Sequence, residues 1–185
     1  MAYSELCLGH ALVDLINQPN DQHFNIVNFS RDDNALYATK NYWVTHRGVS
    51  VEQPNQGWDR YVVFSTDLVV QSWDGLKDAF IGKWRSEEKP IALERGILSN
   101  TNITAGDACA ALQSELLLGP REEKSFVVLM GCVEAQDYRE KALALLRKYN
   151  SIAAARTALR DVHAYWDEYL SSVRVETPDP DMNRM

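Results

Sequence analysis

The sequence predicts a mainly β fold with an α-helical appendage: an antiparallel β-sandwich over residues 1–134, followed by a helical segment over residues 135–173. Short apolar segments rich in Val, Tyr and Phe recur between turn residues up to Glu134, as the strands of a sandwich do. Beyond Glu134 the apolar residues recur at steps of three and four, which is helical spacing. Hydrophobic residues make up 45% of the chain, so a core can form.

The first strands are expected to be short and separated by clear turns. They cover residues 3–8, 24–29, 35–39 and 60–67. Ser72 has the character of a helix N-cap, so a short helix is expected from there to Phe80, although Gly75 weakens it. Residues 90–95 predict a further helical turn, which Gly96 ends.

The two longest strands are expected at residues 109–117 and 125–133. The polar segment 119–124 between them has the composition of a hairpin loop, which predicts that the two strands pair. Apolar and polar residues alternate imperfectly in the first of them. This indicates that both of its faces make contacts within the protein.

The helical segment divides into two predicted helices. The first covers residues 138–149, and Asn150 or Ser151 ends it and caps the next. The second carries a narrow apolar seam, of the kind that packs on another helix or on a sheet. The seam consists of Ile152, Ala155, Leu159, Val162, Trp166, Tyr169 and Val173. Trp166 is therefore expected to be a packing residue, and the seam to cover the sandwich or a further domain.

The last residues predict the beginning of another helix. Asp179 has the character of an N-cap, Pro180 suits the first helical position, and Asp181 favours the positive end of the helix dipole. Only about one turn follows, whereas isolated helices shorter than about 12 residues are marginal. We expect this helix to continue in a longer parent protein; a loose acidic tail is the alternative.

Charge and composition exclude several classes of function. The net charge is −7, which gives no electrostatic help toward nucleic acid or an anionic membrane. The cysteines, Cys7, Cys109 and Cys132, are far apart and odd in number, which favours reduced, mostly buried thiols over disulfides or a zinc site. The N-terminus lacks the features of a signal peptide, and no apolar run is long enough to cross a bilayer. A cytoplasmic protein is expected, with no metal and no membrane partner.

Arginine and tryptophan supply the candidate substrate-binding residues, which are Arg47, Trp58 and Arg60. Arginine suits bidentate contacts to hydroxyls, carboxylates or phosphate, although a structural salt bridge is the alternative. Tryptophan can stack on sugar rings, although it is also a common core anchor. The same two readings apply to Trp43, Trp73 and Trp84.

No catalytic residue is expected in this chain. Asp59 with Asp67, and Asp74 with Asp78, are the candidate carboxylate pairs. A catalytic pair must flank a glycosidic bond, usually from opposite walls of a cleft. Asp74 and Asp78 share one face of the expected helix, so that face is predicted to be solvated. The four histidines have no metal-ligand spacing.

Several collinear motifs resemble the cellobiose and chitobiose phosphorylases (glycoside hydrolase family 94). Residues 72–85, SWDGLKDAFIGKWR, are similar to the family's ETDRxxFLGRxR stretch, although Asp74 and Lys77 depart from its TDR lettering. Further similar segments are PIALERG at 90–96, LSNT at 98–101, DACAALQ at 107–113, YSELCL at 3–8 and VETPDPDMNRM at 175–185.

The resemblance implies a galactose-mutarotase-like β super-sandwich over residues 1–134, a helical linker over 135–173, and the start of an (α/α)6 catalytic barrel at 174–185. It implies an inverting glycoside phosphorylase as the parent, which moves a glucosyl-type unit from a β-linked oligosaccharide to inorganic phosphate and needs no other cofactor. The general acid of that reaction lies in the barrel. The resemblance also implies a homodimer.

The resemblance assigns this chain the role of an accessory module. Two other readings stay open at this stage. One is an autonomous carbohydrate-binding sandwich, and the other is an interaction domain that dimerises through the seam between Ile152 and Val173.

Overall fold

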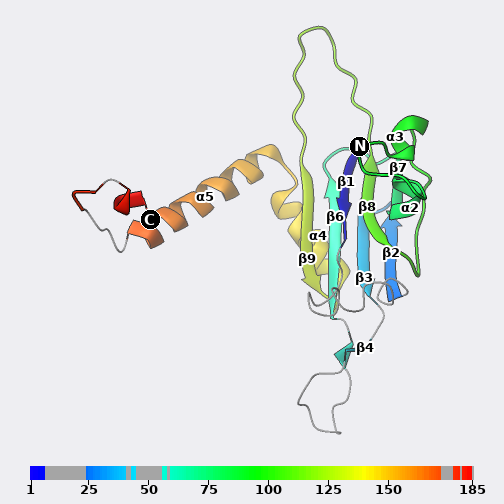
Figure 1. Cartoon of the computed structure of the whole chain (residues 1–185), viewed down its shortest axis with the longest axis horizontal. Coiled ribbons are helices and arrows are strands. Elements are labelled where there is room, and N and C mark those ends of the chain that lie inside the picture. Colours follow the sequence, from blue (N-terminus) through cyan, green and yellow to red (C-terminus); the bar gives the residue numbers. More distant parts are fainter. Residues whose placement is uncertain are drawn as a thin grey trace.

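The computed structural model describes residues 1–6, 24–40, 59–171, 177–179 and 181–184, together with the backbone of 43–44 and 56–57. Two antiparallel sheets form the body of the molecule (Figure 1). One has the order β1 (Ala2–Glu5), β8 (Ala108–Gln113), β7 (Ser72–Leu76). The other has the order β2 (Asn25–Ser30), β3 (Ala35–Lys40), β6 (Arg60–Thr66), β9 (Val128–Glu134). The predicted β-sandwich is confirmed.

A separate two-stranded ribbon joins β4 (Trp43–Val44) to β5 (Gln56–Gly57). The main core lies between the two larger sheets. Val27, Leu36 and Phe64 project from the four-stranded sheet and pack with Leu112 and Trp73 of the three-stranded one. Alternate residues along each strand reach this core, as the period of two requires.

Helices cover the outer faces of both sheets. α2 (Lys77–Phe80) and α3 (Ile91–Arg95) lie on the three-stranded sheet, where Phe80 and Ala92 pack with Cys109 and Ala111. α4 (Tyr138–Tyr149) lies on the four-stranded sheet, where Ala142 and Leu146 pack with Val63 and Leu129. Because both faces of β8 are covered, residues 108–112 are all buried, which explains their imperfect alternation.

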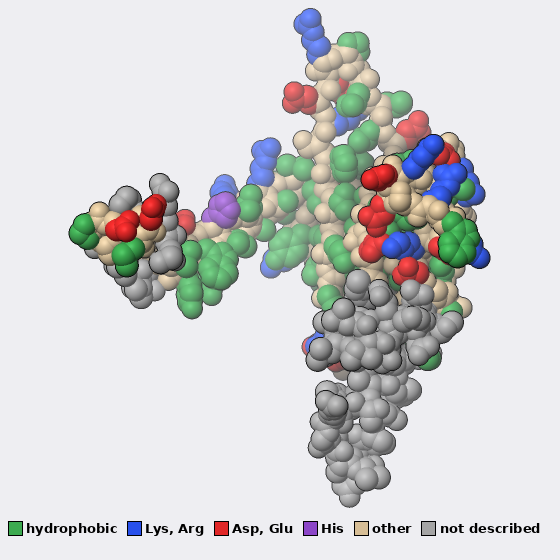
Figure 2. All heavy atoms as spheres, viewed as in Figure 1, with side chains coloured by type: hydrophobic (Ala, Val, Ile, Leu, Met, Phe, Trp, Pro, Cys, Tyr) green, Lys and Arg blue, Asp and Glu red, His purple; other side chains and the backbone are tan. Residues whose placement is uncertain are grey.

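α5 (Ile152–Ser171) projects away from the sandwich (Figure 1). None of its residues is buried. Figure 2 shows hydrophobic side chains gathered along it, and Leu159, Val162 and Trp166 are 57%, 51% and 49% exposed. The seam therefore does not cover the sandwich, and the expectation that Trp166 is packed is wrong within this chain. The ring of Trp166 lies edge-on to the rings of Tyr165 and Tyr169, its neighbours on the same helix.

The segment from Ser72 corrects the sequence prediction. Residues 72–76 form strand β7, and only Lys77–Phe80 are helical. Gly75 marks a close approach of backbones, because a Cβ there would lie 2.8 Å from Cγ1 of Val27 and 3.1 Å from the carbonyl oxygen of Thr101. Its N–H donates to that same carbonyl at 2.8 Å. A glycine inside a strand often marks such an approach, which is the signal that the helix prediction overlooked.

The predicted hairpin of the two longest strands is also wrong. β8 and β9 are shorter than expected and belong to different sheets, and a long loop connects them (Figure 1). β8 has β1 and β7 on its two sides, so neither edge is left for β9, which pairs with β6 instead. The polar composition of residues 119–124 suggests a hairpin turn, because the sequence does not show these long-range strand partners.

Several predictions of helix ends agree with the structure. α4 has the predicted bounds, and α3 ends at Gly96, whose φ of 72° is the left-handed conformation of a helix C-cap. Asp179 accepts a hydrogen bond from the N–H of Asp181 at 2.9 Å, as an N-cap does, ahead of a 3₁₀ turn at Met182–Arg184. Of the cysteines, which were expected to be mostly buried, Cys109 is buried, Cys132 is exposed and Cys7 lies outside the described residues. No helix of the described part is long and apolar enough to cross a membrane.

Candidate functional site

Of the three predicted substrate-binding residues, only Arg60 lies in the described part; Arg47 and Trp58 lie outside it. Arg60 opens β6, and its Nη1 lies 3.4 Å from Asp59 and 3.8 Å from Glu134. Glu134 is also paired with Lys141 at 2.8 Å, which holds the pKa of Glu134 below its ordinary value. Arg60 thus belongs to a surface ion-pair network where β6, β9 and α4 meet.

Neither aspartate pair flanks a cleft. Asp59 and Asp67 lie just beyond opposite ends of β6, so about 25 Å of strand separates them. Asp74 lies on β7 and is completely buried, whereas Asp78 is exposed on α2. The prediction of one solvated face for Asp74 and Asp78 is therefore wrong, because Asp74 is not on the helix.

Asp74 has a structural role. Its Oδ1 accepts hydrogen bonds from the N–H of Ser99 at 3.0 Å, and from the N–H and hydroxyl of Thr101 at 3.3 and 2.8 Å. Its Oδ2 is buried and makes no hydrogen bond within the described residues. Burial raises the pKa of this carboxyl, and the hydrogen bonds from Thr101 and Ser99 only partly oppose that rise.

The tryptophans divide between core and surface. Trp73 is buried, stacks on Phe29 at 4.4 Å between ring centroids, and donates from Nε1 to Asn102 at 2.9 Å. This is the core-anchor role. Trp84 is 95% exposed, so packing does not explain it. The side chains of Trp43 and Trp58 lie outside the described part.

A polar and aromatic groove, which the sequence did not reveal, lies on the outer face of the four-stranded sheet. α4 covers β9 and β6, and the groove opens beside it over β2 and β3, with a volume of about 310 Å³. The groove is lined by Ile26, Asn28, Phe29, Ser30, Asp32, Asp33, Tyr37, Thr39, Tyr61, Tyr138 and Arg139. We call it the Arg139 groove.

Three tyrosines from different elements form its aromatic part. The rings of Tyr61 and Tyr138 are stacked, with centroids 3.9 Å apart, and Tyr37 meets Tyr138 edge-on at 5.4 Å. Burial raises the pKa of Tyr61 and of Tyr37, so both phenols remain protonated at neutral pH. Tyr37 and Tyr61 lie at outward positions of neighbouring strands. Their proximity can be inferred only when the register of β3 and β6 is known.

Asp33 holds the polar part together. Its carboxylate is 5% exposed and accepts from Nε and Nη2 of Arg139 at 2.8 and 2.9 Å. It also accepts from the hydroxyls of Ser30 at 3.0 Å and Tyr37 at 3.1 Å. The Arg139 contact, with help from both hydroxyls, holds the pKa of Asp33 below its ordinary value. This ion pair fastens the first turn of α4 to the β2–β3 turn.

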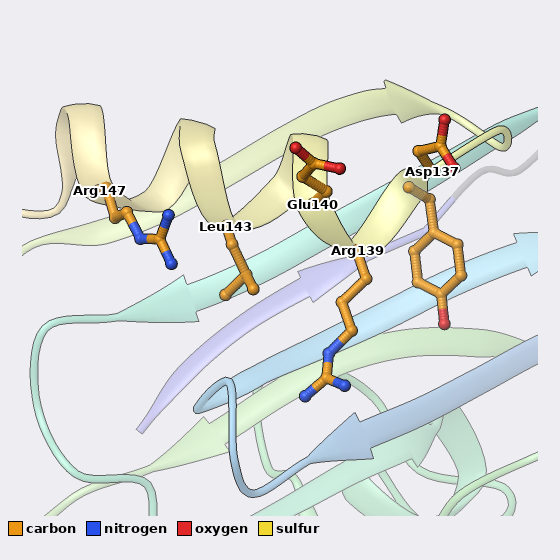
Figure 3. A pocket seen from close by; sticks show the side chains of 6 residues that line it. Asp137, Arg139, Glu140, Leu143 and Arg147 are labelled. Atoms are coloured by element: carbon orange, nitrogen blue, oxygen red, sulfur yellow. The ribbon is translucent and has the colours of Figure 1, made fainter.

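A second, more open hollow of about 540 Å³ continues along α4, and it shares Tyr138 and Arg139 with the groove. Arg139, Leu143 and Arg147 project from one flank of the helix, one turn apart, and Arg139 reaches toward the strands (Figure 3). Asp137 and Glu140 complete the lining. Among the described residues, no three His, Cys, Asp or Glu side chains come together in a way that would hold a metal.

These features define the class of the protein as a β-sandwich domain with helices against both outer faces. The model of the family described as "Glycosyl hydrolase 94, supersandwich domain" matches residues 1–152. The chain belongs to this family.

Curated relatives are much longer than this chain. It is 31% identical over 116 residues to the N,N'-diacetylchitobiose phosphorylase of Vibrio furnissii, covering 63% of this chain and 14% of the relative. It is 29% identical over 118 residues to the 3-O-beta-D-glucopyranosyl-beta-D-glucuronide phosphorylase of Paenibacillus borealis, covering 63% and 15%. It is 26% identical over 184 residues to the cyclic beta-(1,2)-glucan synthase NdvB of Rhizobium meliloti (strain 1021), covering 99% and 6%. The chain thus spans a small part of each.

Proposed function

We propose that this chain is the accessory sandwich-and-linker module of a cytoplasmic, inverting glycoside phosphorylase, and that it is not catalytic alone. The membership of residues 1–152 in the supersandwich family carries the proposal. Two of the relatives are named as phosphorylases of β-linked or chitobiose-type sugars, and the aligned region is about a seventh of each. In this proposal residues 1–134 are sandwich, 135–173 are linker, and 174–185 begin an (α/α)6 catalytic barrel.

The barrel would supply the chemistry of the parent enzyme. A carboxylic acid of the barrel donates its proton to the leaving glycosidic oxygen as the bond from the anomeric carbon breaks. Inorganic phosphate attacks that carbon from the opposite face and forms the new C–O bond of an α-sugar phosphate. In this proposal the module supports the barrel, the loop around Arg47 lies near the barrel mouth, and Trp58 and Arg60 are further candidate substrate contacts.

The proposal predicts that the purified chain does not phosphorolyse cellobiose or N,N'-diacetylchitobiose. The measurement is release of sugar 1-phosphate from each disaccharide in phosphate buffer, with a full-length phosphorylase as the positive control. Turnover that stays with the chain through every step of purification would contradict the proposal. The coding sequence around the gene tests whether a longer parent enzyme exists. We expect it to encode a barrel with its catalytic acid, either in the same reading frame or in an adjacent gene. A locus without one would overturn the proposal.

We expect the barrel to dock on the exposed face of α5. We expect the homodimer to form through the sandwich. We predict that Trp166→Ala changes the free energy of unfolding of the isolated chain by less than about 1 kcal/mol, because Trp166 is half exposed and its ring neighbours, Tyr165 and Tyr169, lie on the same helix. Urea denaturation measures this. In sedimentation equilibrium the variant should keep the self-association of the wild type. A dimer that Trp166→Ala dissociates would instead favour an interaction domain that pairs through this seam.

A further inference from the structure

The Arg139 groove combines aromatic rings with hydrogen-bonding groups that are still open to a ligand. We propose that it is a saccharide-binding site of the sandwich itself, which takes a neutral disaccharide and works without any catalytic barrel. The inference goes beyond the accessory role, since it gives the module a ligand of its own.

The aromatic part suits one face of a pyranose ring. Such rings expose patches of C–H groups that pack on aromatic surfaces, and tyrosine adds a polar tip at the rim. The stacked pair Tyr61 and Tyr138 forms a rigid shelf, because each ring holds the other at 3.9 Å. Neither phenol of this pair makes a hydrogen bond within the described residues, so both hydroxyls are available to a ligand.

The polar part suits neighbouring hydroxyl groups. Asn28 is exposed on β2, and its amide makes no hydrogen bond within the described residues, although it carries donors and an acceptor. Arg139 is fixed by Asp33 through Nε and Nη2, and its Nη1 donates to no described residue. A guanidinium held in this way can bind an oxygen pair without losing further freedom on binding.

Charge selects a neutral ligand over an anion. Asp32 and Asp33 both line the groove, whereas Arg139 is the one cationic side chain among the described residues of its lining. Asp32 lies 4.0 Å from Nη2 of Arg139 and is 90% exposed, so it is free to accept from a sugar hydroxyl. Inorganic phosphate would meet one excess negative charge here and is not expected to bind.

The volume of the groove, together with the hollow that adjoins it, favours a ligand with more than one sugar ring. About 310 Å³ is at the lower end of the range of small-molecule sites, roughly 300–1,000 Å³. The open hollow of about 540 Å³ begins at the same two residues, Tyr138 and Arg139, and extends toward Leu143 and Arg147. A second sugar unit can lie there, which predicts that a disaccharide binds more tightly than a monosaccharide.

The test is isothermal titration calorimetry of the full chain with N,N'-diacetylchitobiose, cellobiose, glucose and inorganic phosphate. We expect saturable binding of at least one disaccharide, weaker binding of glucose, and none of phosphate. Asn28→Ala should weaken disaccharide binding about tenfold, as the loss of two hydrogen bonds would. Because the side chain of Asn28 makes no hydrogen bond with any described residue, the variant should keep the wild-type melting temperature.

Two further variants locate the ligand. Tyr138→Phe keeps the stacked ring and removes the phenol, so a small loss of affinity with an unchanged fold is expected. Trp84→Ala is the matched control, because Trp84 is the most exposed aromatic of the described part and lies away from the groove. Its affinity should equal that of the wild type.

The results of these titrations decide the inference independently of the proposed accessory role. Absence of saturable binding for both disaccharides overturns the inference, and so does binding that Trp84→Ala weakens while Asn28→Ala does not. Neither result depends on catalysis, so the proposed accessory role can fail in the phosphorolysis and locus tests while this site stands, or the reverse.

Discussion

Replacement of Asp74 by alanine is expected to lower the free energy of unfolding by about 3 kcal/mol, because it leaves buried donors without an acceptor. Three donors from Ser99 and Thr101 converge on one carboxylate oxygen, which fixes the segment after α3 against β7. Asp74 is completely buried, so water cannot replace the lost acceptor. This segment also pairs with β2 through Ile103 and Val27, so the loss should spread to the packing between the sheets.

Asn is the matched replacement at this position. The amide oxygen can accept the same three hydrogen bonds, and the neutral group avoids the cost of burying a charge. The pKa of Asp74 is raised in the folded state, so the folded state binds the proton more tightly than the unfolded state does. The stability that comes from this tighter proton binding is therefore fully present below the ordinary pKa of 3.8 and is lost as the pH rises through the raised value, whereas the hydrogen bonds from Ser99 and Thr101 remain.

Urea denaturation across this pH range measures both effects. Asp74→Ala should be much less stable than the wild type at every pH. Asp74→Asn should lack this titration: it should lie close to the wild type below pH 3.8 and should be the more stable of the two at neutral pH, where the wild type buries a charge. An alanine variant as stable as the asparagine variant would show that the three hydrogen bonds contribute little.

Local patterns predicted those elements whose causes are local. α4 has the predicted bounds because its apolar stripe and its end signal at Asn150 lie within the helix itself. α3 ends at Gly96 for the same kind of reason. The resemblance in motif order led to the correct family, although it gave no contact for any single residue.

Elements that depend on distant partners were misassigned. Ser72 looks like a helix cap, but its hydroxyl donates to Gln113 of β8 at 2.6 Å, a partner 41 residues away. β9 pairs with β6 rather than with its neighbour in sequence, because both edges of β8 are occupied. The Arg139 groove was missed for the same reason. Its lining comes from β2, β3, β6 and α4, and no short motif contains more than a part of it.

Asp33 gives the second large expected effect. Asp33→Ala should lower the free energy of unfolding by about 2 kcal/mol, since it removes an acceptor shared by Arg139, Tyr37 and Ser30. The buried hydroxyl of Tyr37 loses its partner outright, whereas water compensates part of the Arg139 contact because that side chain is 55% exposed. Chemical denaturation of the variant at neutral pH measures the loss.

The pH dependence of Asp33 should run opposite to that of Asp74. The pKa of Asp33 is lowered in the folded state, so its contribution is present above the ordinary value of 3.8 and is lost as the pH falls through the lower folded value. Asp33→Asn removes this titration, so the wild type should lose more stability than Asp33→Asn between about pH 4 and pH 2.5. Thermal denaturation over that range provides the comparison. Parallel curves would mean that Arg139 does not hold the carboxylate in its ionised form, and α4 would then be fastened to the sheet by its apolar face alone.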